Sequence, residues 1–98
     1  MVLIAETDAL VYISGHAGAA PPGESVPCEA VTVLCNTLAA SLHEITKQPE
    51  KVLAFESGNV VIDKNGLSAE SDLLVRSFLL GLQMVSEAYP EYIQMTKR

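Results

Sequence analysis

The segment that decides the fold runs from residue 10 to residue 46 and reads LVYISGHAGAAPPGESVPCEAVTVLCNTLAASLHEIT. Apolar residues alternate in its first part, which predicts a strand over 10–14. Residues 15–27 contain three glycines and three prolines, which predict a long loop. The last part predicts a helix from about Cys28 to Thr46, because its apolar residues recur at steps of three and four. They are Val31, Leu34, Leu38, Leu42 and Ile45.

The same two periods continue outside this segment. The predicted elements are strands at 1–6, 10–14, 52–56, 60–63 and 92–95, a helix from about Cys28 to Thr46, and a helix from Ser68 to about Tyr89. Short turns join 1–6 to 10–14 and 52–56 to 60–63, which favours two antiparallel hairpins. The element order is therefore ββαββαβ. We expect one α+β domain over residues 1–98, with two helices packed on one face of a mainly antiparallel sheet.

The second predicted helix has a broad apolar face over residues 73 to 85. Ser68 is a suitable N-cap, and Glu70 and Asp72 in the first turn suit the helix dipole. Gly81 lies in mid-helix, where glycine costs roughly 1 kcal/mol relative to alanine, so we expect a close packing contact there. The apolar face also predicts a homodimer.

Composition excludes several classes of function. The chain has 98 residues, 49% of them hydrophobic, and a net charge of −6, which argues against direct nucleic-acid binding because phosphate contacts need clustered cations. The acidic surface is compatible with a basic protein partner. We expect no membrane span, because no apolar run approaches the roughly 18 residues needed. With no secretory signal visible at the N-terminus, we expect a cytoplasmic protein.

The two cysteines have different expected roles. Cys35 is seven positions beyond Cys28 on the predicted helix, roughly 10 Å by helical rise, which is too far for a disulfide. Cys35 is expected in the core. Cys28 follows Pro27 at the start of the helix, where amides and the dipole stabilise a thiolate. With His16 folded over it as a base, Cys28 would form the nucleophilic pair of a cysteine hydrolase, and the adjacent amides could bind an oxyanion.

Other interpretations of the same residues stay open. A single cysteine near a helix start is most often a small buried residue, and a histidine beside glycine in a loop is most often solvated. Glu24 and Glu29 flank the thiol, and unpaired negative charge there disfavours a thiolate. His43 is expected on the surface near the helix C-terminus. The spacing of the cysteines and histidines fits no zinc site, so we expect no metal and no cofactor.

Two motifs resemble a known family. They are Ser14-Gly15-His16-Ala17-Gly18-Ala19-Ala20 and the segment from Gly23 to Val31, which reads GESVPCEAV. They are similar to the signature SGHAGYA followed by GxDIVCAAVS of the ribosomal-processing cysteine protease family Prp, also called YsxB-like. The C-terminal segments Leu79-Leu80-Gly81-Leu82 and Tyr89-Pro90-Glu91-Tyr92-Ile93 look like the end of that family, and the resemblance covers almost the whole chain.

The resemblance implies a homodimeric thiol endopeptidase of α+β fold. Members remove a short N-terminal extension from a large-subunit ribosomal protein, and related phage proteins act on virion proteins. By position, the resemblance makes Cys28 the nucleophile and His16 the general base, and makes Gly15, Gly18, Gly23 and Ser25 part of the substrate-binding loop.

The chain departs from the signature at several positions. Ser25 stands where the family has Asp, Pro27 where it has Val, Glu29 where it has a small residue, and Ala19 where it has an aromatic. These departures keep open a non-catalytic binding or ribosome-assembly factor on the same fold. A redox module using Cys28 is a further alternative, although no resolving cysteine is within reach and an intermolecular partner would be needed.

Overall fold

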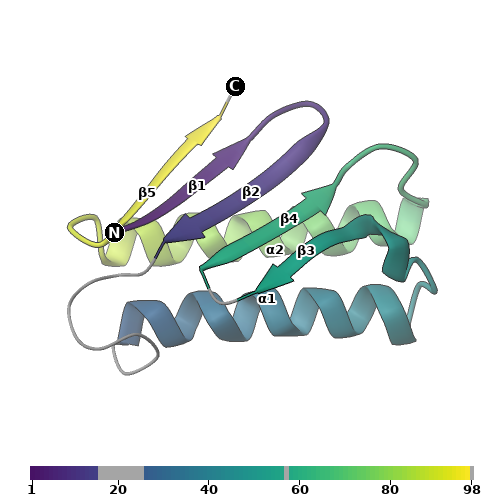
Figure 1. Cartoon of the computed structure of the whole chain (residues 1–98), viewed down its shortest axis with the longest axis horizontal. Coiled ribbons are helices and arrows are strands. Elements are labelled where there is room, and N and C mark those ends of the chain that lie inside the picture. The colour runs from purple at the N-terminus through teal and green to yellow at the C-terminus, as the bar shows by residue number, and fades with distance from the viewer. Residues whose placement is uncertain (16–25, 57, 98) are drawn as a thin grey trace.

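The computed structural model describes residues 1–15, 26–56 and 58–97, which form five strands, two α-helices and one 3-10 turn (Figure 1). The elements are β1 (Val2–Glu6), β2 (Leu10–Gly15), α1 (Val26–Glu44), η1 (Pro49–Lys51), β3 (Val52–Glu56), β4 (Asn59–Asp63), α2 (Ala69–Ala88) and β5 (Ile93–Lys97). The predicted α+β class and the ββαββαβ order are confirmed, with bounds that differ by one or two residues.

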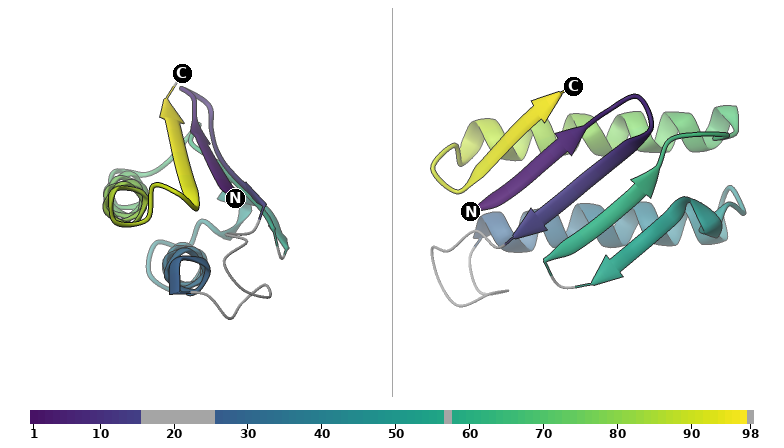
Figure 2. Two further views of the ribbon diagram at one scale, coloured as in Figure 1. Left: turned by 90° about the vertical axis from the view of Figure 1, so that its left-hand side faces the viewer. Right: turned by 45° about the horizontal axis from the view of Figure 1, so that its top comes forward.

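The five strands form one sheet in the order β3-β4-β2-β1-β5. All neighbouring pairs are antiparallel except β1 and β5, which run parallel. Both helices lie against the same face of this sheet, as the left view of Figure 2 shows, where the two helices are seen end-on. The result is a two-layer molecule in which the opposite sheet face carries exposed Leu3 and Tyr12.

The register of the strands explains which face is buried. Ile4 of β1 lies opposite Ile13 of β2, and Val11 of β2 lies opposite Ile62 of β4. All four side chains are buried in the core beneath the helices. Because side chains alternate between the faces of a strand, this register directs every second residue toward the helices.

The first helix begins and ends two residues earlier than predicted. It starts at Val26, so that Pro27 occupies its second position, and it stops at Glu44. Ile45, predicted on the apolar stripe, is therefore 70% exposed beyond the helix end, whereas Leu38 and Leu42 are buried. Periodicity alone could not show this end, because Ile45 continues the apolar spacing.

The second helix follows its predicted start and its predicted packing. The Ser68 side chain caps it by accepting a hydrogen bond from the Ser71 backbone amide, at 3.1 Å. Gly81 lies where the helices meet: a Cβ there would approach Leu34 Cδ2 of α1 to 3.0 Å. Glycine therefore allows the two helices to pack closely at this point. Neither helix of the described chain is long and apolar enough to cross a membrane.

Candidate active site

Cys28 is the third residue of α1, in the turn whose amides have no helical partner. Its side chain is partly buried and packs against the core. The Thr32 hydroxyl donates a hydrogen bond to the Cys28 carbonyl oxygen, at 2.9 Å. The predicted placement of this thiol in the first helical turn is confirmed, and Glu29 beside it is exposed.

A cavity of about 400 Å³ opens beside Cys28, between the first half of α1 and the sheet. Its volume lies in the range of ligand sites in proteins. Three parts of the fold line the cavity: α1, the strand ends of β1 and β2, and the β3–β4 hairpin. The lining residues are Val2, Ile13, Gly15, Cys28, Val31, Thr32, Cys35, Asn36, Phe55, Glu56, Gly58, Asn59 and Val60.

Gly15 ends β2 at the rim of this cavity. Its φ is +89°, and a Cβ at this position would collide with the backbone carbonyl oxygen of Met1. Its amide donates a hydrogen bond to the Gly58 carbonyl oxygen, at 3.0 Å, which joins β2 to the β3–β4 turn. Glycine at position 15 is therefore required by both backbone conformation and space, and it shapes the cavity that Cys28 lines.

Cys35 lies two helical turns beyond Cys28 and is buried in the core, as predicted. Burial raises the pKa of the Cys35 thiol from 9.0 to about 11, because the apolar surroundings disfavour the charged thiolate. Cys35 is therefore a neutral thiol at physiological pH. The two cysteines of the sequence both lie within the described part of α1, and neither forms a disulfide.

The cavity also contains polar residues that the sequence did not single out. Glu56 of β3 and Asn59 of β4 are opposite each other in the strand ladder, and both line the cavity. The Asn59 Oδ1 atom is buried and has no hydrogen-bond partner among the described residues. A buried acceptor without a donor costs about 1–3 kcal/mol. The sequence predicted a short turn between 52–56 and 60–63, but no local pattern indicated that this turn borders Cys28.

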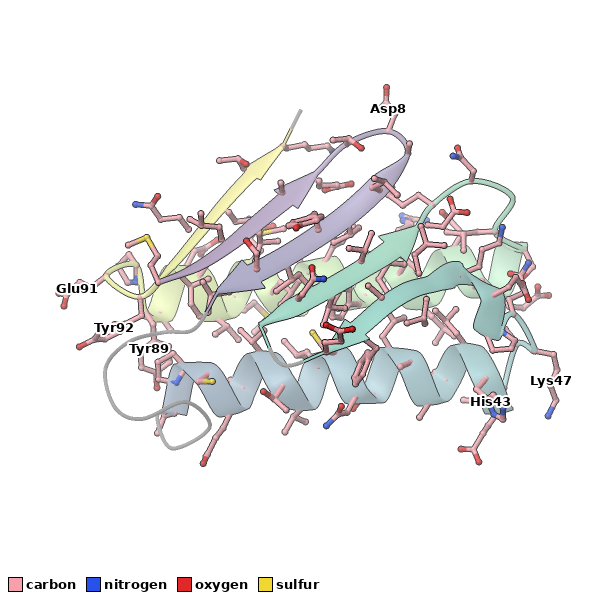
Figure 3. All side chains as sticks on the ribbon, viewed as in Figure 1. Asp8, His43, Lys47, Tyr89, Glu91 and Tyr92 are labelled. Carbon is pink, nitrogen blue, oxygen red and sulfur yellow. The ribbon has the colours of Figure 1, made fainter. Side chains whose placement is uncertain are left out.

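The other predicted site residues have different outcomes. His16, Gly18, Gly23 and Ser25 lie outside the described residues, as does Glu24, so their predicted roles stay predictions. His43 is exposed in the last turn of α1, as predicted. Figure 3 shows His43 and Lys47 at one end of the molecule and Tyr89, Glu91 and Tyr92 at the other, where α1 begins.

His43 cannot act on Cys28. His43 is fifteen positions beyond Cys28 on the same helix, roughly 22 Å away by helical rise. Within the described ranges, no three histidine, cysteine or acidic side chains are grouped so that they could hold a metal ion. Cys28 supplies this site with a thiol in the first turn of a helix, beside a largely apolar cavity.

Comparison with solved structures supports the fold. The chain is similar to the ribosomal processing protease Prp from S. aureus solved with a covalently linked product peptide, with a TM-score of 0.85, 17% identity and full coverage of both chains. It is also similar to that protease with a substrate peptide, with a TM-score of 0.77 and 17% identity over both full chains. SMU.848 from Streptococcus mutans matches with a TM-score of 0.71 and 22% identity, over 98% of this chain and 90% of the other.

Comparison with curated sequences gives no significant match. The family comparison covers most of the chain, since the model of the cysteine protease Prp family matches residues 7–94. That range includes both helices, three of the five strands in full and every residue that lines the Cys28 cavity except Val2. The predicted resemblance is confirmed: the chain belongs to the cysteine protease Prp family.

Proposed function

We propose that this protein is a cysteine endopeptidase in which Cys28 is the nucleophile and His16 is the general base. The observation that carries the proposal is the position of Cys28, in the first turn of α1 and at the wall of a cavity, in a chain of the Prp family. The role of His16 rests on its place in the family motif.

The proposed reaction is acyl transfer in two steps. His16 takes the thiol proton, and the Cys28 sulfur attacks the scissile carbonyl carbon to form a tetrahedral intermediate. Amides of the first turn of α1 stabilise the oxyanion. The C–N bond breaks as the imidazolium protonates the leaving amine, which leaves a thioester on Cys28. Water, deprotonated by His16, then attacks the thioester and releases the new carboxyl terminus with the thiol restored.

We propose as substrate a short N-terminal extension of a large-subunit ribosomal protein or, in a phage setting, of a virion protein. The support is family membership together with the S. aureus relative, which is described as a ribosomal processing protease and binds a substrate peptide. Gly15 at the cavity rim supports the proposed contact between the substrate and the loop that follows β2. Gly18, Gly23 and Ser25 complete that proposed contact, with no cofactor or metal.

The decisive experiment measures the rate of iodoacetamide alkylation of Cys28 from pH 4 to pH 10, in the Cys35→Ala background and with His16→Ala beside it. A coupled pair predicts alkylation that persists well below neutral pH and a loss of that low-pH reactivity in His16→Ala. A profile like that of an ordinary cysteine, unchanged in His16→Ala, favours the binding-factor alternative. That alternative draws support from Glu29 in the first turn of α1 and from Pro27, which removes one amide there.

Cleavage is tested directly with synthetic peptides that carry the N-terminal extension of a bacterial large-subunit ribosomal protein, analysed by mass spectrometry. Wild type is expected to cut at one position, and Cys28→Ala is expected to cut nowhere. Cleavage that persists in Cys28→Ala would refute the assigned nucleophile, provided that circular dichroism shows the variant folded.

We further propose a cytoplasmic homodimer. Leu73, Leu80 and Met84 share one face of α2 and are 60–66% exposed, so α2 presents an apolar surface that the core of this chain does not cover. A dimer mass by light scattering at micromolar concentration is expected, with a shift toward monomer in Leu80→Glu. A monomer mass for wild type would contradict the proposal.

A further inference from the structure

β3 forms an open edge of the sheet at the wall of the Cys28 cavity. Within the described residues it pairs with β4 alone, and the right view of Figure 2 shows it as the outermost strand. Its sequence, VLAFE, contains neither the proline nor the lysine that commonly protect edge strands, and Leu53 and Phe55 are 55% and 46% exposed. Such an edge is a template for pairing with another extended chain.

The hydrogen bonds of the next strands show which backbone groups of β3 face outward. The Gly15 amide donates to the Gly58 carbonyl oxygen, at 3.0 Å. Bonding alternates along an antiparallel ladder, so Val60, two residues beyond Gly58, also bonds to β2 and not to β3. Phe55 lies opposite Val60. The Phe55 amide and carbonyl therefore point away from β4, toward the open edge.

A bulge in β3 limits where a further strand can pair. The register with β4 shifts between Val52 and Ala54, and such an irregularity interrupts the row of edge groups. The regular part of the edge is the end with Phe55 and Glu56, and both of these residues line the Cys28 cavity. At the other open edge of the sheet, none of the described residues of β5 lines it.

The facing wall of the cavity is one side of α1. The lining residues of that helix recur at steps of three and four: Cys28, Val31, Thr32, Cys35 and Asn36. From Cys28 to Asn36 this wall measures roughly 12 Å by helical rise. An extended chain spans that length with about four residues, so a peptide that pairs with the end of β3 can continue along the cavity to Cys28.

Pairing with β3 would also orient the side chains of the peptide. Phe55 lies opposite the buried Val60, so its side chain is on the face that the helices cover. A residue that pairs with Phe55 carries its side chain on the same face, which here is the space between β3 and α1. Its two neighbours point to the opposite face. One peptide side chain is therefore directed into the cavity.

We propose that an extended polypeptide segment binds to this protein as an additional strand on the open edge of β3. The Phe55 amide and carbonyl bond to the peptide main chain, and the peptide continues along α1 to Cys28. Main-chain hydrogen bonds supply the affinity in this mode of recognition. The inference rests on the proposed function for the identity of the peptide, but strand addition itself is tested without cleavage.

The first test uses peptides selected from a random library for binding to the Cys28→Ser protein. Each amide of the tightest-binding peptide is N-methylated in turn, and Kd is measured by fluorescence anisotropy. Successive amides of an extended chain point in opposite directions, so methylation is expected to weaken binding at alternate residues. Hydrogen exchange at the Phe55 amide is expected to slow when the peptide binds. A scan without alternation, an unprotected Phe55 amide or a library that yields no binder would overturn the proposal.

The second test removes the edge amide from the protein. Phe55→Pro lacks this donor and Phe55→Val keeps it with a side chain of similar size, so their difference isolates the amide. Proline is tolerated at this position because the Phe55 amide takes no part in the ladder with β4. Phe55→Pro is expected to bind the selected peptide about fivefold more weakly than Phe55→Val, which is the contribution of one hydrogen bond. Equal affinities would refute the assigned edge contact.

The matched control is Met95→Pro against Met95→Val on the other open edge. The Val2 amide donates to the Tyr92 carbonyl oxygen, so alternate residues of β5 bond to β1 and the Met95 amide points outward. Peptide affinity is expected to be equal in these two variants. An equal loss at both edges would show that proline acts by general destabilisation, and the assignment to β3 would fall.

Two further measurements separate this inference from its alternatives. If Phe55→Pro and Phe55→Val cleave the ribosomal-protein extension peptide with equal KM, strand addition is refuted and the peptidase stands. If selected peptides bind at the edge and no peptide is cleaved, the peptidase is refuted and strand addition stands. Light scattering of Phe55→Pro is expected to give the wild-type mass, and a shift from dimer to monomer would assign the β3 edge to a second copy of the chain instead.

Discussion

Replacing Gly15 with alanine is expected to strain the rim of the Cys28 cavity and the start of the sheet together. A left-handed φ costs a non-glycine residue about 1–2 kcal/mol. The added Cβ would also collide with the Met1 carbonyl oxygen, which is backbone and cannot rotate away. Displacing Met1 threatens the neighbouring hydrogen bond from the Val2 amide to the Tyr92 carbonyl oxygen, at 2.8 Å, worth about 1 kcal/mol.

These contributions predict a loss of about 2–4 kcal/mol in the free energy of unfolding. A chain of this size is stable by about 5–15 kcal/mol, so Gly15→Ala should still fold, with Tm lower by roughly 10–25 °C. Urea unfolding followed by circular dichroism measures the change.

Gly66→Ala is the matched control for the Gly15 substitution. Gly66 also has a positive φ, +69°, but its Cβ would meet only the flexible end of the Lys51 side chain, at 3.1 Å. We expect Gly66→Ala to lose only the strain energy, about 1–2 kcal/mol. If Gly15→Ala loses no more stability than Gly66→Ala, the collision with the Met1 carbonyl oxygen does not destabilise the protein and the reasoning is refuted.

Three further predictions concern stability. Burial raises the pKa of Cys35 from 9.0 to about 11, so this thiol ionises in the unfolded chain at a lower pH than in the folded one. The free energy of unfolding should therefore be unaffected by Cys35 below pH 9 and should fall by up to about 2 kcal/mol toward pH 11. Urea midpoints across that range should show the fall in wild type, and an equal fall in Cys35→Ala would contradict it. Gly81→Ala should destabilise the wild-type protein, because the added Cβ would crowd Leu34. In the Leu34→Ala background the same substitution should stabilise the protein by about 1 kcal/mol, because alanine has the higher helix propensity. Equal effects in the two backgrounds, measured by thermal unfolding, would rule out the crowding. Ser68→Ala should lose about 1 kcal/mol with the N-cap bond to Ser71, measured in the same way, and an unchanged Tm would show that the cap does not contribute.

Local patterns predicted the elements of the fold well because the forces that define them act over a few residues. The capping hydroxyl of Ser68 and the helical spacing after it placed α2 to within one residue of its end. Ile45 shows the limit of this approach. It satisfies the apolar period of α1, yet the chain leaves the helix at Glu44 and the side chain is exposed.

The candidate site was predicted only in its helical half. Pro27 and the helical pattern that follows it placed Cys28 at a helix start, and the apolar spacing placed Cys35 in the core. No local pattern linked the β3–β4 turn to Cys28, because almost thirty residues lie between them along the chain.

The sequence by itself determined the order of strands and helices, the start of α1 near Cys28 and the family signature, because each depends on residues close together in the chain. Only the tertiary structure decided the strand order β3-β4-β2-β1-β5 and the parallel pairing of β1 with β5. The tertiary structure also brought the β3–β4 turn to the wall of the Cys28 cavity. Such contacts form when apolar faces that are distant in the sequence are buried against one another. The free energy of that burial depends on the whole core, so no single segment of sequence specifies it.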